Sequence, residues 1–117
     1  MNKVLSVLNY LSQSVLVDQS ISAGGGYRVY SDGWKEQWGL VTSVAYSNNT
    51  INVTFLKPFV YEPQVVMATP RMGSGSDGSY NISGRVANVS TTGMTVRTGK
   101  NNDASGGHPT QWYAAGF

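Results

Sequence analysis

The sequence predicts an all-β domain, an antiparallel sandwich or barrel of about six to seven strands, with a short α-helix at its N-terminus. Aromatic and β-branched runs recur every dozen or so residues between clusters of turn-forming residues. No helical period appears after residue 20. A chain of 117 residues without cysteine supports one domain with a short appendage. We therefore predict a helical stub over residues 1–22 and a β domain over residues 23–117.

The first segment carries a helical stripe. Val4, Leu8, Leu11 and Val15 are spaced four, three and four residues apart, as in two heptads of a coiled coil. Two interpretations stay open: an amphipathic helix that caps the β domain, or the end of an oligomeric stalk. The polar residues that follow predict fraying before about residue 18. Three consecutive glycines after Ala23 then predict a hinge or turn.

The strands are predicted from apolar runs and from the turn-forming residues that separate them. Asp32-Gly33 between two such runs predicts a hairpin, and Ile51, Val53 and Phe55 alternate with polar residues as in a half-buried strand. The run from 64 to 69 is almost wholly apolar, which predicts a central strand. The expected strands are Tyr27–Tyr30, Trp34–Val41, Thr50–Leu56, Gln64–Thr69, Tyr80–Val89, Met94–Thr98 and Gln111–Phe117. Trp34 and Trp38 are expected on one strand face, in the core or a subunit interface, and Trp112 in the core.

Composition excludes several classes of partner. Charged residues make up only 12% of the chain, and the net charge is +2 with no basic run, so we expect no nucleic-acid binding. No signal peptide or membrane-inserting segment is recognisable. A surface covered mainly by Ser, Thr, Asn, Gly and Tyr suits neutral polar ligands such as glycans, or burial against other subunits.

Two polar, glycine-rich loops, 71–79 and 99–110, flank the predicted 80–98 hairpin, and we expect them to project from the same end of the domain. Loops on a rigid scaffold are common binding sites. The candidate ligand-binding residues, each of which could equally be an ordinary solvated side chain, are Arg71, Asp77, Tyr80, Lys100, Asn101, Asn102, Asp103 and His108.

No convincing catalytic group appears in the sequence. The only histidine, His108, lies in a Gly-Gly-His-Pro loop that is unsuited to holding triad geometry. Asp77 and Asp103 could face each other as a glycosidase needs, but both lie in loops too rich in glycine to preorganise an acid and a base. The motif Gly73-x-Gly75-x-x-Gly78 lacks the helix that a dinucleotide site requires. We predict a protein that is not an enzyme, with no cofactor and no metal site.

The order and spacing of several motifs resemble the C-terminal domains of phage tail fibres. Residues 27–39 resemble the pattern Y-x-S-x-G-W-x-E-Q-x-G, and residues 53–59 resemble V-T-F-x-x-P-F. Residues 90–96 and 112–117 resemble S-x-T-G-F-x-V and W-x-A-x-G-x. The resemblance implies a compact antiparallel β-sandwich similar to the H-type lectin fold. It further implies a homotrimer at the fibre tip that contacts the bacterial surface.

The resulting expectation is a receptor-binding tip domain of the virion's tail fibre, made in the host cytoplasm without a signal peptide. It would trimerise through the stalk stripe and bind a surface glycan, lipopolysaccharide or another outer-membrane receptor through the two loops. Two alternatives remain. One is a purely structural cap that trimerises and folds the fibre, and the other, less favoured, is a glycan hydrolase that uses Asp77 and Asp103.

Overall fold

A computed structural model describes residues 14–42, 50–71, 84–98 and 109–117 of the chain. These residues form eight strands and contain no helix, and so none that could cross a membrane. The strands are β1 (Leu16–Ser22), β2 (Gly25–Tyr30), β3 (Lys35–Thr42), β4 (Thr50–Thr54), β5 (Val65–Pro70), β6 (Gly84–Ala87), β7 (Gly93–Thr98) and β8 (Pro109–Gly116).

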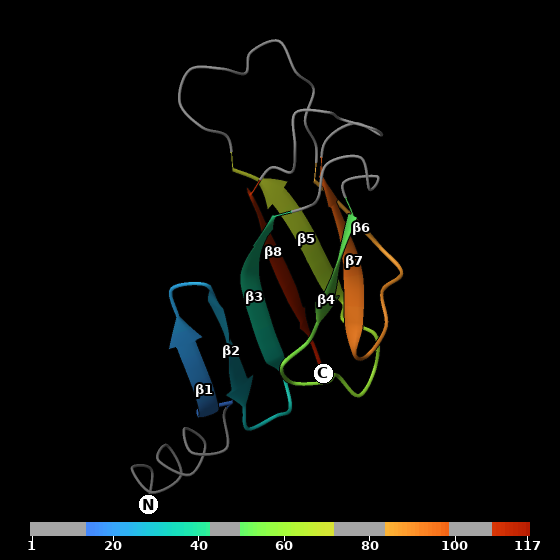
Figure 1. Ribbon diagram of the computed structural model, residues 1–117. Coiled ribbons are helices and arrows are strands. Elements are labelled where there is room, and N and C mark those ends of the chain that lie inside the picture. The colour runs from blue at the N-terminus through green and yellow to red at the C-terminus, as the bar shows by residue number, and fades with distance from the viewer. Residues whose placement is uncertain (1–13, 43–49, 72–83, 99–108) are drawn as a thin grey trace, which may run out of the picture.

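The strands form two antiparallel sheets, as the sequence predicted (Figure 1). The larger sheet has the order β1-β2-β3-β8-β5, and the smaller has the order β4-β7-β6. The two sheets meet where β6 approaches β5, because a Cβ built on Gly84 would lie 2.1 Å from the carbonyl oxygen of Ala68. A side chain at residue 84 would therefore push the two sheets apart at this seam.

The core lies between the smaller sheet and strands β3, β8 and β5. Its buried residues are Val53, Phe55, Phe59, Met94, Val96 and Ala114. The alternation predicted for β4 is confirmed, because Val53 is buried while Asn52 and Thr54 are exposed. Phe55 contacts Phe59 edge-on, with ring centroids 5.1 Å apart, and Trp112 at 6.1 Å. The prediction that Trp112 packs against the core is thus confirmed.

The hairpin predicted at Asp32-Gly33 is also confirmed and joins β2 to β3. The backbone N–H of Trp34 donates to Asp32 Oδ1 at 2.9 Å, a local bond that favours a turn. Gly33 has a φ of 94°, a conformation that side chains other than glycine rarely adopt. Trp34 precedes β3 and does not share a strand face with Trp38. Its ring lies edge-on to that of Phe117, with centroids 5.3 Å apart.

The helical stub predicted over residues 1–22 is not helical at its end, because Leu16–Ser22 forms strand β1. Val4, Leu8 and Leu11 lie outside the described residues. Val15 is described and is not helical. Its N–H donates to Ser31 Oγ at 3.0 Å, and its carbonyl accepts from the Ser31 N–H at 2.8 Å. Extended pairing with the β2–β3 turn therefore replaces helix formation at this end of the predicted stripe.

The predicted glycine hinge is a tight hairpin turn. Only Ala23 and Gly24 form the turn, whereas Gly25 and Gly26 belong to β2. Both strand positions exclude a side chain. A Cβ on Gly25, whose φ is 152°, would lie 2.5 Å from the Trp38 carbonyl oxygen, and a Cβ on Gly26 would lie 2.4 Å from that of Ser20. Close approach of neighbouring backbones, and not flexibility, accounts for these two glycines.

The strand predicted over 64–69 exists as β5, but it is an edge strand of the larger sheet and not a central one. Val66 and Ala68 pack toward the core, whereas Val65 and Met67 point outward and are exposed. The uniform apolar run thus reflects one buried face and one exposed apolar face.

Candidate functional site

The described chain has one terminal gap and three internal gaps, and the strand ends on either side of each internal gap lie at the same end of the sandwich. Thr42 pairs with Pro109, and Thr50 pairs with Arg97. Gly84 pairs with Thr98, and the Arg71 N–H donates to the Pro109 carbonyl at 2.7 Å. The strand ends before and after residues 72–83 and 99–108 therefore gather at one end, as the sequence predicted for the two polar loops (Figure 1).

A hollow of about 210 Å³ lies beside these strand ends. We call it the loop-end hollow, and it is lined by residues 22–25 of the β1–β2 turn and by Trp38, Gly39, Leu40, Arg71 and Gln111. Arg71 is the last described residue before 72–83, and Gln111 lies in β8 just after 99–108. One cation, one amide and one indole therefore converge where both candidate loops are attached.

Of the candidate ligand residues, Arg71 alone can be placed in the fold. It is exposed and lines the loop-end hollow. The others, Asp77, Tyr80, Lys100, Asn101, Asn102, Asp103 and His108, lie outside the described residues. Sequence reasoning missed Trp38 and Gln111 as neighbours of Arg71. Their positions in β3 and β8 gave no binding signal, because the hollow arises only when β1–β2 folds against β3.

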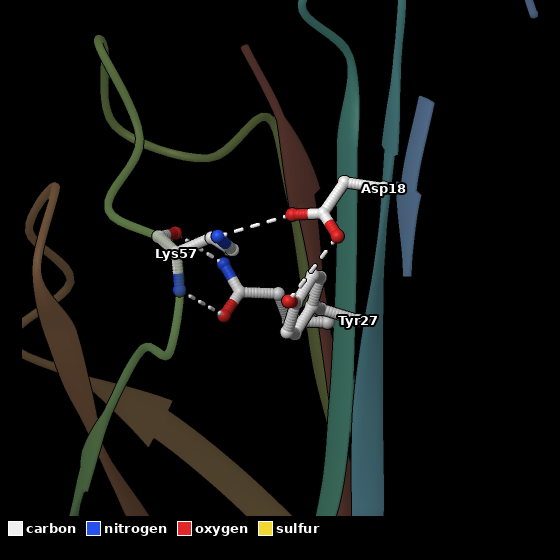
Figure 2. A network of polar contacts seen from close by, with 4 residues as sticks. Asp18, Tyr27 and Lys57 are labelled. Atoms are coloured by element: carbon white, nitrogen blue, oxygen red, sulfur yellow. Dashed lines mark hydrogen bonds and ion pairs between the residues drawn. The ribbon is translucent and has the colours of Figure 1, made fainter. Parts of the chain in front are cut away.

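A second polar cluster joins the hairpin to the connection between β4 and β5 (Figure 2). Lys57 Nζ lies 3.1 Å from Asp18 Oδ2 and 4.9 Å from the centre of the Tyr27 ring. Tyr27 Oη donates to Asp18 Oδ1 at 3.5 Å. The hydrogen bond and the charge of Asp18 raise the pKa of Lys57 above its ordinary value, with the Tyr27 hydroxyl adding a smaller effect.

Buried Gln37 completes this cluster from the core side. Its amide donates to the Lys57 carbonyl and accepts the Lys57 N–H, the latter at 3.0 Å. The side chain is fully buried, so both of its bonds are made away from competing water. The cluster therefore fixes the path of the chain after β4 and is structural. Within the described residues, no group of three acidic, histidine or cysteine side chains could hold a metal ion.

The described strands form an antiparallel two-sheet domain, and the loop-end hollow lies at the end where the three internal gaps begin and end. The chain belongs to the family described as tail fiber protein gp53-like, C-terminal, whose model matches residues 29–117. It is therefore a C-terminal domain of a phage tail fibre and a component of a virion. No curated protein matches it significantly.

Solved tail fibres of pyocins share the fold. A C-terminal fragment of the P. aeruginosa R2 pyocin fibre matches 86% of this chain with 25% identity and a TM-score of 0.66. An N-truncated R2-type pyocin tail fibre matches all of it with 23% identity and a TM-score of 0.68. The chain spans 26% and 44% of those two structures. An N-truncated R1-type fibre, of which 98% is covered, matches with 19% identity and a TM-score of 0.60.

Proposed function

We propose that this domain is the receptor-binding tip of a phage tail fibre, and that it binds a glycan or lipopolysaccharide of the host surface through its loop end. The loop-end hollow carries this proposal, because Arg71, Trp38 and Gln111 converge where loops 71–79 and 99–110 are attached. An indole offers an apolar surface to a sugar ring, while guanidinium and amide groups bond hydroxyls or anionic groups. Binding, and not hydrolysis, is the proposed role.

We further propose that the domain acts as a homotrimer, in which three weak sites gain strength by avidity. Exposed apolar side chains on the outer face of the larger sheet support this proposal. Val65 and Met67 point outward there, and Met67 is 53% exposed. Ile21 on β1 is 56% exposed. Exposed apolar side chains of this kind are common at subunit interfaces. The mass of the native assembly tests the trimer directly.

The test of receptor binding measures attachment of the fluorescently labelled protein to host cells. Arg71→Ala and Gln111→Ala should weaken attachment, and exchange of residues 71–79 or 99–110 should abolish or redirect it. Arg85→Ala is the matched control, because Arg85 is exposed on β6 and does not line the hollow. Equal attachment by the loop-exchanged and original proteins would contradict the proposed site.

The exposed apolar side chains on the outer face of the larger sheet also support the structural alternative. In that alternative the domain is a cap that trimerises and folds the fibre without binding a receptor. A trimer that fails to label any host cell would favour that alternative. A hydrolase would instead release oligosaccharide when incubated with capsule or lipopolysaccharide, and we expect none.

A further inference from the structure

A larger groove lies on the other side of the β1–β2 turn. Strand β2 begins at Gly25, which pairs with Gly39, and the Leu40 N–H donates to the Gly24 carbonyl at 3.1 Å. Past Leu40, no described strand pairs with this edge of β3, and residues of β4 line the groove opposite it. The resulting groove has a volume of about 350 Å³, within the range of small-molecule sites. We call it the turn groove; it is defined here by Ser20, Gly24, Gly39, Asn52, Thr54 and Trp112.

The floor of the turn groove is the indole of Trp112, which packs against Gly39. A Cβ on Gly39 would lie 2.5 Å from Trp112 Nε1, so the indole N–H sits directly over the residue that lines the groove. Trp112 is held from the core side by Phe55, with ring centroids 6.1 Å apart. The indole is thus fixed in position before any ligand arrives, which reduces the entropy lost on binding.

The walls carry polar groups that form no hydrogen bond with any other described residue. Within the described part of the chain, the hydroxyls of Ser20 and Thr54 and the indole N–H of Trp112 have no hydrogen-bond partner. Asn52 accepts a bond from Thr95 Oγ1 at 3.3 Å, and among the described residues its Nδ2 donates none. The residues that carry these donors and acceptors line the groove beside an aromatic surface.

Among the residues that the structure describes, no charged side chain lines the turn groove. An anionic ligand group would lose its hydration there without gaining a countercharge, which is unfavourable. A neutral molecule with several hydroxyls fits the available bonds, and its apolar C–H face suits the indole. Arg71 belongs to the loop-end hollow on the opposite side of the turn, so the two sites differ in charge.

We infer that the turn groove binds an uncharged sugar unit. The inference deepens the proposed function and rests on it, since the sugar would be a second point of contact with the same surface glycan. The linings of the loop-end hollow and the turn groove have six residues in common, namely Ser22, Gly24, Gly25, Trp38, Gly39 and Leu40. A glycan chain can therefore pass over the turn and contact both sites.

The test titrates the full chain with neutral sugars, namely D-glucose, D-galactose, D-mannose, L-rhamnose and N-acetyl-D-glucosamine, and records tryptophan fluorescence. A Trp34→Phe background leaves Trp38 and Trp112, both of which line the groove, as reporters. At least one sugar should give a saturable change. Asn52→Ala should weaken it about five- to tenfold, the effect of one lost hydrogen bond.

Gly24→Leu should narrow both the turn groove and the loop-end hollow, because Gly24 lines both. The fold should stay intact, because a Cβ on Gly24 meets nothing within 4 Å. Gly24→Ala is the matched control and should bind normally. Arg71→Ala should also keep sugar binding, since Arg71 does not line this groove. Absence of a saturable change with every sugar would overturn the inference. Equal affinity in Gly24→Leu, or loss in Arg71→Ala without loss in Asn52→Ala, would overturn it as well.

Attachment to host cells, measured on Asn52→Ala and Arg71→Ala, separates the two proposals, because Asn52 lines only the turn groove and Arg71 only the loop-end hollow. Attachment by a protein that shows no saturable response to any neutral sugar would refute the turn groove and leave receptor binding intact. A sugar response that weakens in Asn52→Ala, in a protein that labels no cells, would support the groove and refute the receptor-binding role.

Discussion

The β1–β2 hairpin and the sandwich core are held by different kinds of contact. All seven residues of β1 are exposed, whereas Val96 and Ala114 in the core are fully buried. The smaller sheet covers β3, β8 and β5, and the hairpin lies beyond that cover (Figure 1). The hairpin is tied down by backbone pairing with β3 and by the Asp18–Lys57 ion pair. Stability should therefore be concentrated in the core, with the hairpin opening more readily.

The largest expected effect comes from removing a core ring. Phe55→Ala deletes a side chain that is 4% exposed and contacts both Phe59 and Trp112. Substitutions of this kind lower the free energy of unfolding by about 3–5 kcal/mol. Ile21→Ala on β1 should change it by less than about 0.5 kcal/mol, as is usual for exposed sites in a monomeric state. Urea unfolding followed by circular dichroism measures both.

If Ile21→Ala proves as costly as Phe55→Ala, the hairpin is buried in the native assembly. The oligomeric state of both variants, measured by native mass, would then identify that contact. Such a result would show that a second copy of the chain buries the hairpin.

A smaller effect is expected where the two regions meet. Gln37→Ala removes the amide that bonds both the N–H and the carbonyl of Lys57, and it leaves these groups without their partner. One unsatisfied buried group costs about 1–3 kcal/mol. Gln19→Ala on exposed β1 is the matched control and should have little effect. A loss for Gln37→Ala no greater than that of Gln19→Ala would show that water replaces the amide.

The core could be predicted because each of its strands carries a local signal. Val53 and Phe55 alternate with polar residues, and Asp32-Gly33 is a residue pair typical of hairpin turns. Strand β1 has no such signal, since neither of its faces is buried and no alternation of burial is imposed on Leu16–Ser22. The prediction that Gly25 and Gly26 belong to a hinge fails for a related reason. Their strand role depends on the carbonyls of Trp38 and Ser20, which pairing brings close.

The candidate site likewise has one part that the sequence predicts and another part that it does not. Loop composition alone pointed to Arg71 and to the end of the sandwich where its loop is attached. The hollow beside Arg71 and the turn groove could not be predicted, because both depend on where the hairpin stops along β3. The groove also needs Trp112 of β8 to lie over Gly39, a contact set by strand register across the sheet and not by any neighbouring residue.

The smallest expected effect tests the polar tie between the hairpin and the core. Asp18 raises the pKa of Lys57, so the bond favours the charged amine. Its stabilisation is fully present below the unfolded pKa of 10.5 and is lost as pH rises through the raised folded value. Asp18→Asn should lower the urea midpoint slightly at pH 8. Because Asp18 and Lys57 are exposed, high salt should shrink the difference.

Above the raised pKa of Lys57, the wild type and Asp18→Asn should unfold at the same urea concentration, since the amine is then neutral in both. Glu62→Gln is the control, because it removes an exposed carboxylate outside the cluster and should not respond to pH in this way. A midpoint difference that persists at pH values where Lys57 is neutral would mean that Asp18 stabilises the hairpin by a contact other than its ion pair with Lys57.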